Sequence, residues 1–199
     1  MRRHAYKFII MILTGALLGG CENKDKTTAE AALKAAEEAI NTAKAEASKY
    51  VPDQAKSLDA ELAAAREKFS KGDYKGALAD AQALASKAKD VASAAAAKKT
   101  ELTKSWEDLS SGLPRVIEAI QSRVDILSQS KKLPAGMTAE TLAQAKAGLT
   151  EMRQQWAAAT EAAKNGNLAD AVSKAAAVKV RAAEVLTLLK MPVPEALKA

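Results

Sequence analysis

The chain has 199 residues and a formal net charge of +6, from 30 Lys and Arg against 24 Asp and Glu. Its one histidine, His4, and its one cysteine, Cys21, both lie near the N-terminus, so the rest of the chain has neither an imidazole nor a thiol. This composition excludes disulfides, histidine-based triads and ordinary zinc sites from the rest of the chain. We therefore expect a protein that is not an enzyme, with no catalytic residue, no metal site and no cofactor.

The N-terminal segment has the three parts of a secretory signal. Basic residues Arg2, Arg3 and Lys7 precede an apolar run over residues 8–18, and the composition turns polar directly after Cys21. A transmembrane helix is the alternative, but a span needs roughly 20 apolar residues, which is more than this run holds. We predict that residues 1–20 are a cleaved signal peptide.

The end of this segment, Leu18-Gly19-Gly20-Cys21, resembles the lipobox of bacterial lipoproteins, in which a leucine and two small residues precede the modified cysteine. The resemblance implies cleavage before Cys21, a diacylglyceryl thioether on its sulfur, and acylation of the new amine, for example by palmitate. Membrane lipid would then hold the protein through Cys21, with residues 21–26 as a lipidated tether. Because Glu22 rather than aspartate follows the cysteine, the resemblance further implies the outer membrane of a Gram-negative bacterium, facing the periplasm.

The chain from residue 27 onward is predicted to be helical, because alanine, leucine, glutamate, lysine and glutamine dominate it. Alternation of apolar and polar residues, the strand signal, is not sustained anywhere in this part. Thr27 with Glu30 forms a capping box at the predicted start. Proline, glycine and asparagine then divide the chain into six predicted helices, at about 28–49, 53–70, 74–109, 114–130, 139–164 and 168–190, followed by a frayed tail over 192–199.

Two of the predicted joints resemble each other. The joint at Gly72, before the third helix, and the joint at Gly166, before the sixth, align with an offset of 94 residues. The same offset carries Leu84 onto Val178 in the following helix. We therefore predict two related three-helix units, at 27–110 and 111–191.

The stretch Ala65-x-x-x-Phe69-x-x-Gly72-Asp73-Tyr74-x-x-Ala77, within residues 65–81, is similar to the middle of a tetratricopeptide hairpin. In that family an aromatic, a turn glycine, a second aromatic and a small residue pack two antiparallel helices. More broadly, the chain resembles the alanine-rich helical lipoproteins of Gram-negative bacteria. The hairpin resemblance implies two helices that approach closely through alanine.

The predicted fold is all-α, an antiparallel bundle of about six helices, because the joints between the amphipathic helices are short. Apolar residues at steps of three and four also permit a coiled coil, so an elongated, self-associating rod is the alternative. The bundle is favoured because the breaks recur often enough to fold the chain back on itself.

Trp106, Trp156 and Tyr74 are the candidate binding residues. All three can instead serve packing, since large aromatics on an apolar stripe dominate burial and Tyr74 can close its hairpin. Basic side chains are interspersed with acidic ones rather than gathered into a stripe, which argues against nucleic acid as a partner. The hypothesis is a lipid-anchored, non-catalytic cell-envelope protein that binds a protein partner or acts as a spacer. A carrier of a small apolar ligand, held between the two units near the tryptophans, is the alternative.

Overall fold

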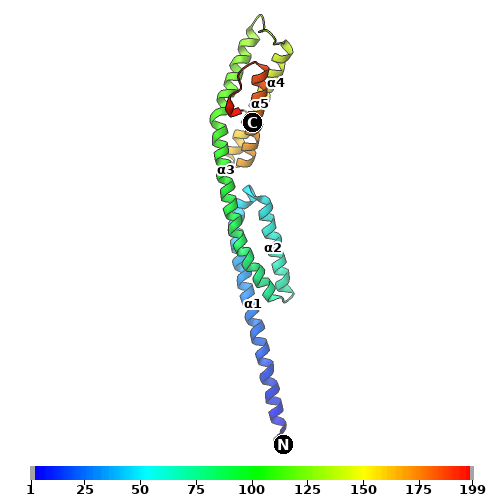
Figure 1. The fold of residues 1–199 in the computed structure, drawn as a ribbon. Helices are drawn as coiled ribbons and strands as arrows, with labels where there is room; N and C mark the ends of the chain where they lie inside the picture. Colours follow the sequence, from blue (N-terminus) through cyan, green and yellow to red (C-terminus); the bar gives the residue numbers. More distant parts are fainter. Residues whose placement is uncertain (1–2, 198–199) are drawn as a thin grey trace. The chain divides into compact units, whose positions relative to one another are not determined.

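The computed structural model describes residues 3–197, and side chains from Lys24 onward. Over that range the chain has five α-helices, one short 3-10 turn and no strand, so the all-α prediction is confirmed (Figure 1). The elements are α1 (Arg3–Tyr50), α2 (Pro52–Ser70), α3 (Tyr74–Gln129), α4 (Ala139–Lys164), α5 (Leu168–Leu188) and η1 (Glu195–Leu197).

The chain divides into two compact units, Met1–Lys98 and Lys99–Ala199, called unit 1 and unit 2 below. Unit 1 contains α1, α2 and the first part of α3, and unit 2 contains the rest of α3 with α4, α5 and η1. The division falls at residue 98, inside α3, rather than at the predicted position after residue 110.

The prediction of six helices is wrong, because α3 continues through Gly112 and Pro114, where a break was expected. A proline inside a helix removes one backbone hydrogen bond and costs about 3 kcal/mol. Here the flanking side chains Leu113 and Ile117 are both buried in the core of unit 2, and their burial requires the helical register on both sides of the proline. The two units are therefore not two sets of three separate helices, because α3 serves both.

The start of the first helix also differs from the prediction. Residues 21–26 were expected to be a tether and Thr27 an N-cap, but α1 begins at Arg3 and runs through all of them. The Thr28 hydroxyl donates to the Lys24 carbonyl at 2.8 Å, a bond that lies inside the helix. The predicted N-cap at Thr27 therefore did not decide where the helix begins.

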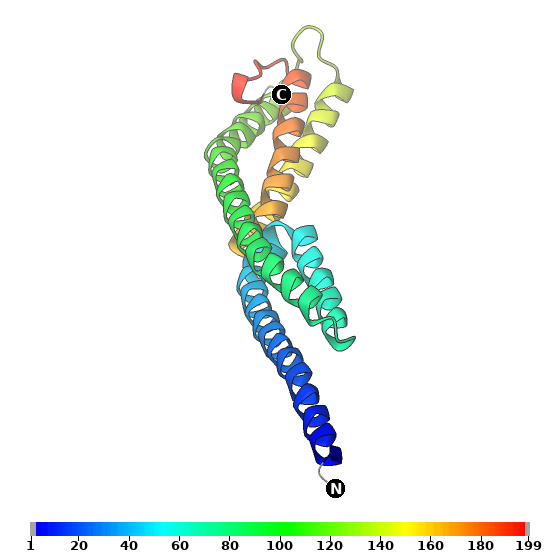
Figure 2. The ribbon, with the colours of Figure 1, turned by 60° about the horizontal axis from the view of Figure 1, so that its bottom comes forward.

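In unit 1, α1, α2 and the first part of α3 lie side by side (Figure 2). An alanine-rich core between these helices holds the unit together. Arg66 of α2 pairs with Glu37 of α1 at 2.6 Å, and Asp59 of α2 pairs with Lys44 of α1 at 2.7 Å, so α2 runs antiparallel to α1. The core members are Leu33, Ala36, Ile40, Ala43, Ala47, Ala55, Leu58, Leu62, Ala65, Ala81, Leu84, Ala88, Val91 and Ala95.

Unit 2 has a core with larger side chains, between the second part of α3, α4 and α5. Gly148 is buried where α4 meets α5. A Cβ atom on Gly148 would lie 2.6 Å from Val185 Cγ2, so the glycine lets the two helices approach. The core includes Leu113, Ile117, Ile120, Val124, Leu127, Leu142, Leu149, Met152, Val178, Val185, Leu186 and Leu189.

The α2–α3 and α4–α5 joints share most of their backbone hydrogen bonds at an offset of 94 residues; in the first joint Tyr74 N–H also donates to the Gly72 carbonyl at 2.9 Å. Gly72 and Gly166 both adopt a positive φ, +84° and +75°, which a glycine takes without strain. The next residue in each joint caps the following helix: Asp73 accepts from Gly76 N–H at 2.9 Å, and Asn167 from Asp170 N–H at 3.3 Å. The N–H to carbonyl pairs are Lys71–Glu67, Gly72–Phe69 and Asp73–Lys68 in one joint, and Asn165–Glu161, Gly166–Ala163 and Asn167–Ala162 in the other.

The units differ in the length of the connection that precedes α2 in unit 1 and α4 in unit 2. Val51 alone separates α1 from α2, whereas residues 130–138 separate α3 from α4. The C-terminal segment packs onto unit 2: Lys190 Nζ donates to the Ala135 carbonyl at 3.1 Å, and Leu197, 8% exposed, belongs to the core. The tail was expected to fray from residue 192, but it is ordered through η1 because Leu197 finds an apolar site.

Candidate functional site

Cys21, the predicted lipid-attachment residue, lies within α1, but its side chain is outside those that the structure describes. The backbone of α1 continues without interruption from Cys21 to Ala29, the first buried residue among the described side chains. Lipid attachment therefore stays a prediction from the sequence. The structure shows that the residues after Cys21 are helical.

Trp106 of α3 and Trp156 of α4 form a stacked pair. Their ring centroids are 5.6 Å apart and their planes are inclined by 12°, so one face of each ring is covered by the other. Both are partly buried and pack against the core of unit 2. The predicted unit boundaries placed the two tryptophans in different units; that placement is wrong, because the boundary precedes Trp106 and both rings belong to unit 2.

Tyr74 begins α3 in unit 1 and makes an edge contact with Phe69 at the end of α2. Their ring centroids are 5.2 Å apart and their planes are inclined by 65°. The contact closes the α2–α3 hairpin, which is the packing role expected for Tyr74. Tyr74 belongs to unit 1 and the tryptophan pair to unit 2.

A groove that sequence analysis missed lies between α4 and α5. It has a volume of about 470 Å³ and surrounds Arg181, which pairs with Glu151 at 3.1 Å and with Glu184 at 2.7 Å. The hydrogen bond to Glu184 is the main cause that raises the pKa of Arg181. Val180, which is 61% exposed, also lines this groove.

Unit 1 carries a corresponding groove of about 220 Å³ between α2 and α3, beside Lys87. Lys87 Nζ donates to Glu61 and, at 3.3 Å, to Ser57, and Ser57 donates to Glu61 at 2.6 Å. The hydrogen bond from Lys87, followed by that from Ser57, lowers the pKa of Glu61. The Glu61 carboxylate is thus ionised at neutral pH, and its ion pair with Lys87 links α2 to α3.

The two grooves occupy equivalent places in their units. The offset of 94 carries Lys87 onto Arg181, Glu61 onto Gln155 and Ser57 onto Glu151. Each groove is therefore lined by a basic residue at the equivalent position, and the acidic partner on the preceding helix differs in position by one turn. The repeat offset, which the sequence shows as far as Leu84 and Val178, reaches both basic residues three positions further along and is the signal that could have located them.

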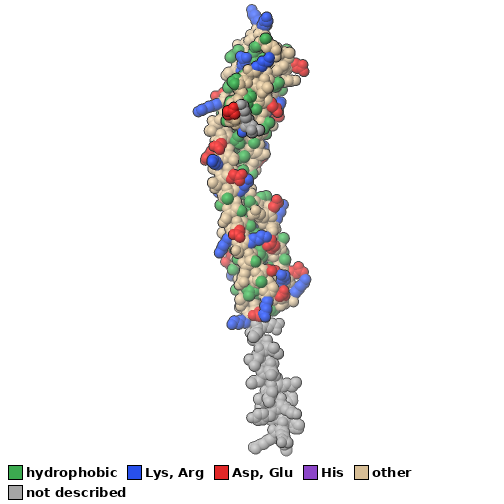
Figure 3. Space-filling model, viewed as in Figure 1, with side chains coloured by type: hydrophobic (Ala, Val, Ile, Leu, Met, Phe, Trp, Pro, Cys, Tyr) green, Lys and Arg blue, Asp and Glu red, His purple; other side chains and the backbone are tan. Residues whose placement is uncertain are grey.

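The surface around these features carries charges of both signs. On the face drawn in Figure 3, Lys and Arg side chains are interspersed with Asp and Glu along the part of the chain that is described. Within the described residues, no group of three or more metal-binding side chains is placed to hold an ion, and no helix is both long and apolar enough to cross a membrane.

Comparison with known proteins returns no match to a family model, to a curated protein or to a solved structure.

Proposed function

We propose that the protein is a lipid-anchored, non-catalytic protein of the cell envelope that serves as a protein-interaction or spacer module. The observation that carries the proposal is Leu18-Gly19-Gly20-Cys21, which follows a basic start and a short apolar run. Two or more acyl chains on one residue give stable membrane attachment, at about 0.8 kcal/mol per buried methylene. Glu22 after the cysteine favours the outer membrane, with the helical units on the periplasmic side.

Replacement of the acylated sulfur tests the anchor. We expect Cys21→Ser to abolish incorporation of labelled palmitate and to move the protein from the membrane fraction to the soluble fraction. Gly20→Ala is the matched control, because it keeps a small residue before Cys21 and should leave labelling and fractionation unchanged. Labelled palmitate on the Cys21→Ser protein, or unchanged membrane association, would contradict the proposal.

The proposed interaction role draws support from the partly buried tryptophan pair and the mixed surface charge. Aromatic side chains in partly exposed clusters are enriched at protein interfaces. Crosslinking in intact cell envelopes should capture a stoichiometric protein partner, and Trp106→Ala should reduce the yield. Repeated crosslinking without any partner would contradict an interaction role and leave the spacer role.

We also infer that the two units descend from one repeated hairpin pattern. The support is the backbone hydrogen bonds that the two joints share and the basic residue that lines each groove, all at an offset of 94. Exchange of the residues 68–76 for 162–170 tests this inference. The exchanged protein should keep its helical content and its thermal midpoint within a few degrees, whereas a loss of folding would contradict the equivalence of the joints.

A further inference from the structure

We propose that a second groove of unit 1 binds small organic cations that have an apolar body. This groove has a volume of about 510 Å³ and lies between the start of α2 and the unit 1 part of α3. Both helices contribute lining residues, and all of these residues belong to unit 1. The proposal goes beyond the proposed envelope role and does not depend on acylation of Cys21.

The charges that line the second groove are mainly negative. Asp53 of α2 and Asp90 of α3 are both exposed, and among the described side chains neither makes an ion pair or a hydrogen bond. Lys87 is the basic residue of the lining, and its ammonium group is paired with the Glu61 carboxylate. The two unpaired carboxylates therefore favour a positively charged ligand, because a concave surface lined by one sign of charge concentrates ions of the other.

The second groove also offers apolar surface to a ligand. Val91, which is 4% exposed, and Ala94, which is partly buried, belong to its lining. A volume of about 510 Å³ lies within the roughly 300–1,000 Å³ that small-molecule pockets occupy. Contact of an apolar ligand body with these side chains contributes affinity, while the carboxylates select the charge of the ligand.

The equivalent place in unit 2 is filled by a direct contact between helices. At the offset of 94, Gln54 corresponds to Gly148 and Val91 to Val185. A Cβ atom on Gly148 would lie 2.6 Å from Val185 Cγ2, so α4 and α5 leave no room there for a side chain. In unit 1, by contrast, Gln54 is exposed and lines the groove together with Val91. The two units therefore differ at this place, with a helix contact in unit 2 and a groove in unit 1.

The test measures the binding of three naphthalene probes that differ in charge. They are 1-naphthylmethylamine, which is a cation at neutral pH, the uncharged 1-naphthylmethanol, and the anion 1-naphthoate. The full chain is reconstituted in phosphatidylcholine vesicles, and equilibrium dialysis at low ionic strength gives the bound fraction after subtraction of protein-free vesicles. We expect the amine to bind about fivefold more tightly than the alcohol, since exposed carboxylates add modest affinity, and the naphthoate to bind most weakly.

Two variants separate the effect of charge from that of volume. Asp90→Asn should weaken binding of the amine about threefold and leave binding of the alcohol unchanged. Asp90 is chosen over Asp53 because a negative charge in the first turn of α2 also stabilises that helix. Ala94→Leu, which installs the residue of unit 2, should weaken binding of both probes by about fivefold or more, because the larger side chain fills part of the groove.

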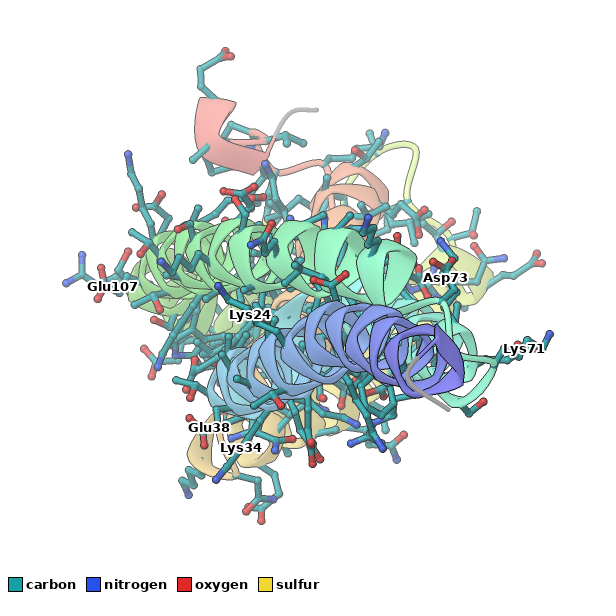
Figure 4. The ribbon with its side chains drawn as sticks, turned by 90° about the horizontal axis from the view of Figure 1, so that it is seen from below. Lys24, Lys34, Glu38, Lys71, Asp73 and Glu107 are labelled. Atoms are coloured by element: carbon teal, nitrogen blue, oxygen red, sulfur yellow. The ribbon has the colours of Figure 1, made fainter. Side chains whose placement is uncertain are left out.

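Glu38→Gln is the matched control for the loss of one negative charge. Glu38 is exposed on α1, outside the residues that line the groove, and Figure 4 shows its side chain projecting outward beside Lys34. This variant should bind the amine within about twofold of the unaltered protein, because distant exposed charges are screened. Circular dichroism should give all three variants the same helical content.

Amine binding that is no stronger than alcohol binding would overturn the proposal. An equal loss of amine affinity in Asp90→Asn and Glu38→Gln would also overturn it, by showing that net charge rather than the groove attracts the cation. A folded Ala94→Leu protein that binds both probes unchanged would place binding outside the groove. If the Ala94→Leu protein does not fold, the comparison of Asp90→Asn with Glu38→Gln decides, since both change exposed residues.

Discussion

The two units share their backbone pattern and differ in the volume of their cores. At equivalent positions 94 residues apart, Ala55 of unit 1 corresponds to Leu149 of unit 2, and Ala95 to Leu189, and all four are buried. Unit 1 thus buries less apolar area per helix turn, and small side chains let its helices approach closely. The comparison teaches that the spacing of apolar positions and the turn glycines specify the hairpin, while side-chain size at those positions is free to vary.

The largest expected effects come from truncating one core residue in each unit. Leu58 and its equivalent Met152 are both fully buried, so Leu58→Ala and Met152→Ala should each lower the free energy of unfolding by about 2–5 kcal/mol. Both tryptophans belong to unit 2, so their fluorescence during urea unfolding reports on that unit, whereas circular dichroism reports on both. Leu58→Ala should shift the dichroism transition more than the fluorescence transition, and equal shifts would contradict separate units.

A smaller effect is expected at the close approach that unit 2 makes through Gly148. Gly148→Ala should destabilise the protein by about 1–3 kcal/mol in thermal unfolding, since the new Cβ would overlap Val185. Gly112→Ala is the control within a helix: nothing lies within 4 Å of its Cβ position, so it should stabilise the protein by up to about 1 kcal/mol. A stabilised Gly148→Ala protein would show that the α4–α5 contact is looser than the structure has it.

Removal of the two N-caps tests the equivalence of the joints. Asp73→Ala and Asn167→Ala each delete a side chain that accepts a hydrogen bond from the first turn of the next helix, and each should cost about 1 kcal/mol. Chemical denaturation of the two variants and of the double variant measures these costs. Costs that differ by more than about 1 kcal/mol would contradict equivalent joints.

The smallest expected effect depends on pH and concerns the groove of unit 1. The hydrogen bond from Lys87 lowers the pKa of Glu61, so this group stabilises the fold above its usual pKa, and that contribution is lost as the pH falls through the lowered value. Glu61→Gln, which installs the unit 2 residue, should cost about 0.2–1 kcal/mol at neutral pH, since the pair is partly exposed. Urea unfolding should give the two proteins equal stability once the pH is well below the lowered pKa.

Sequence reasoning predicted the helices, the two glycine joints and the offset of 94, because each depends on local chemistry: helix propensity, positive φ at glycine, and capping by the next residue. It did not predict the continuity of α3, because a proline is a strong local signal and the compensating burial of Leu113 and Ile117 involves residues distant in the chain. The candidate site residues show the same contrast between local features, which the sequence predicts, and contacts between distant residues, which it does not. Tyr74 was placed correctly beside its turn, whereas the contact between Trp106 and Trp156 joins residues 50 positions apart.

The sequence by itself determined that the chain is helical and where two of its hairpins turn; lipid attachment at Cys21 stays a prediction from the sequence. The tertiary structure decided which helices are continuous, which aromatic rings meet, and how near α4 and α5 come at Gly148. The physical reason is that backbone conformation at a turn depends on a few adjacent residues. Helix continuity and side-chain contacts depend instead on apolar area that only the packed helices can bury.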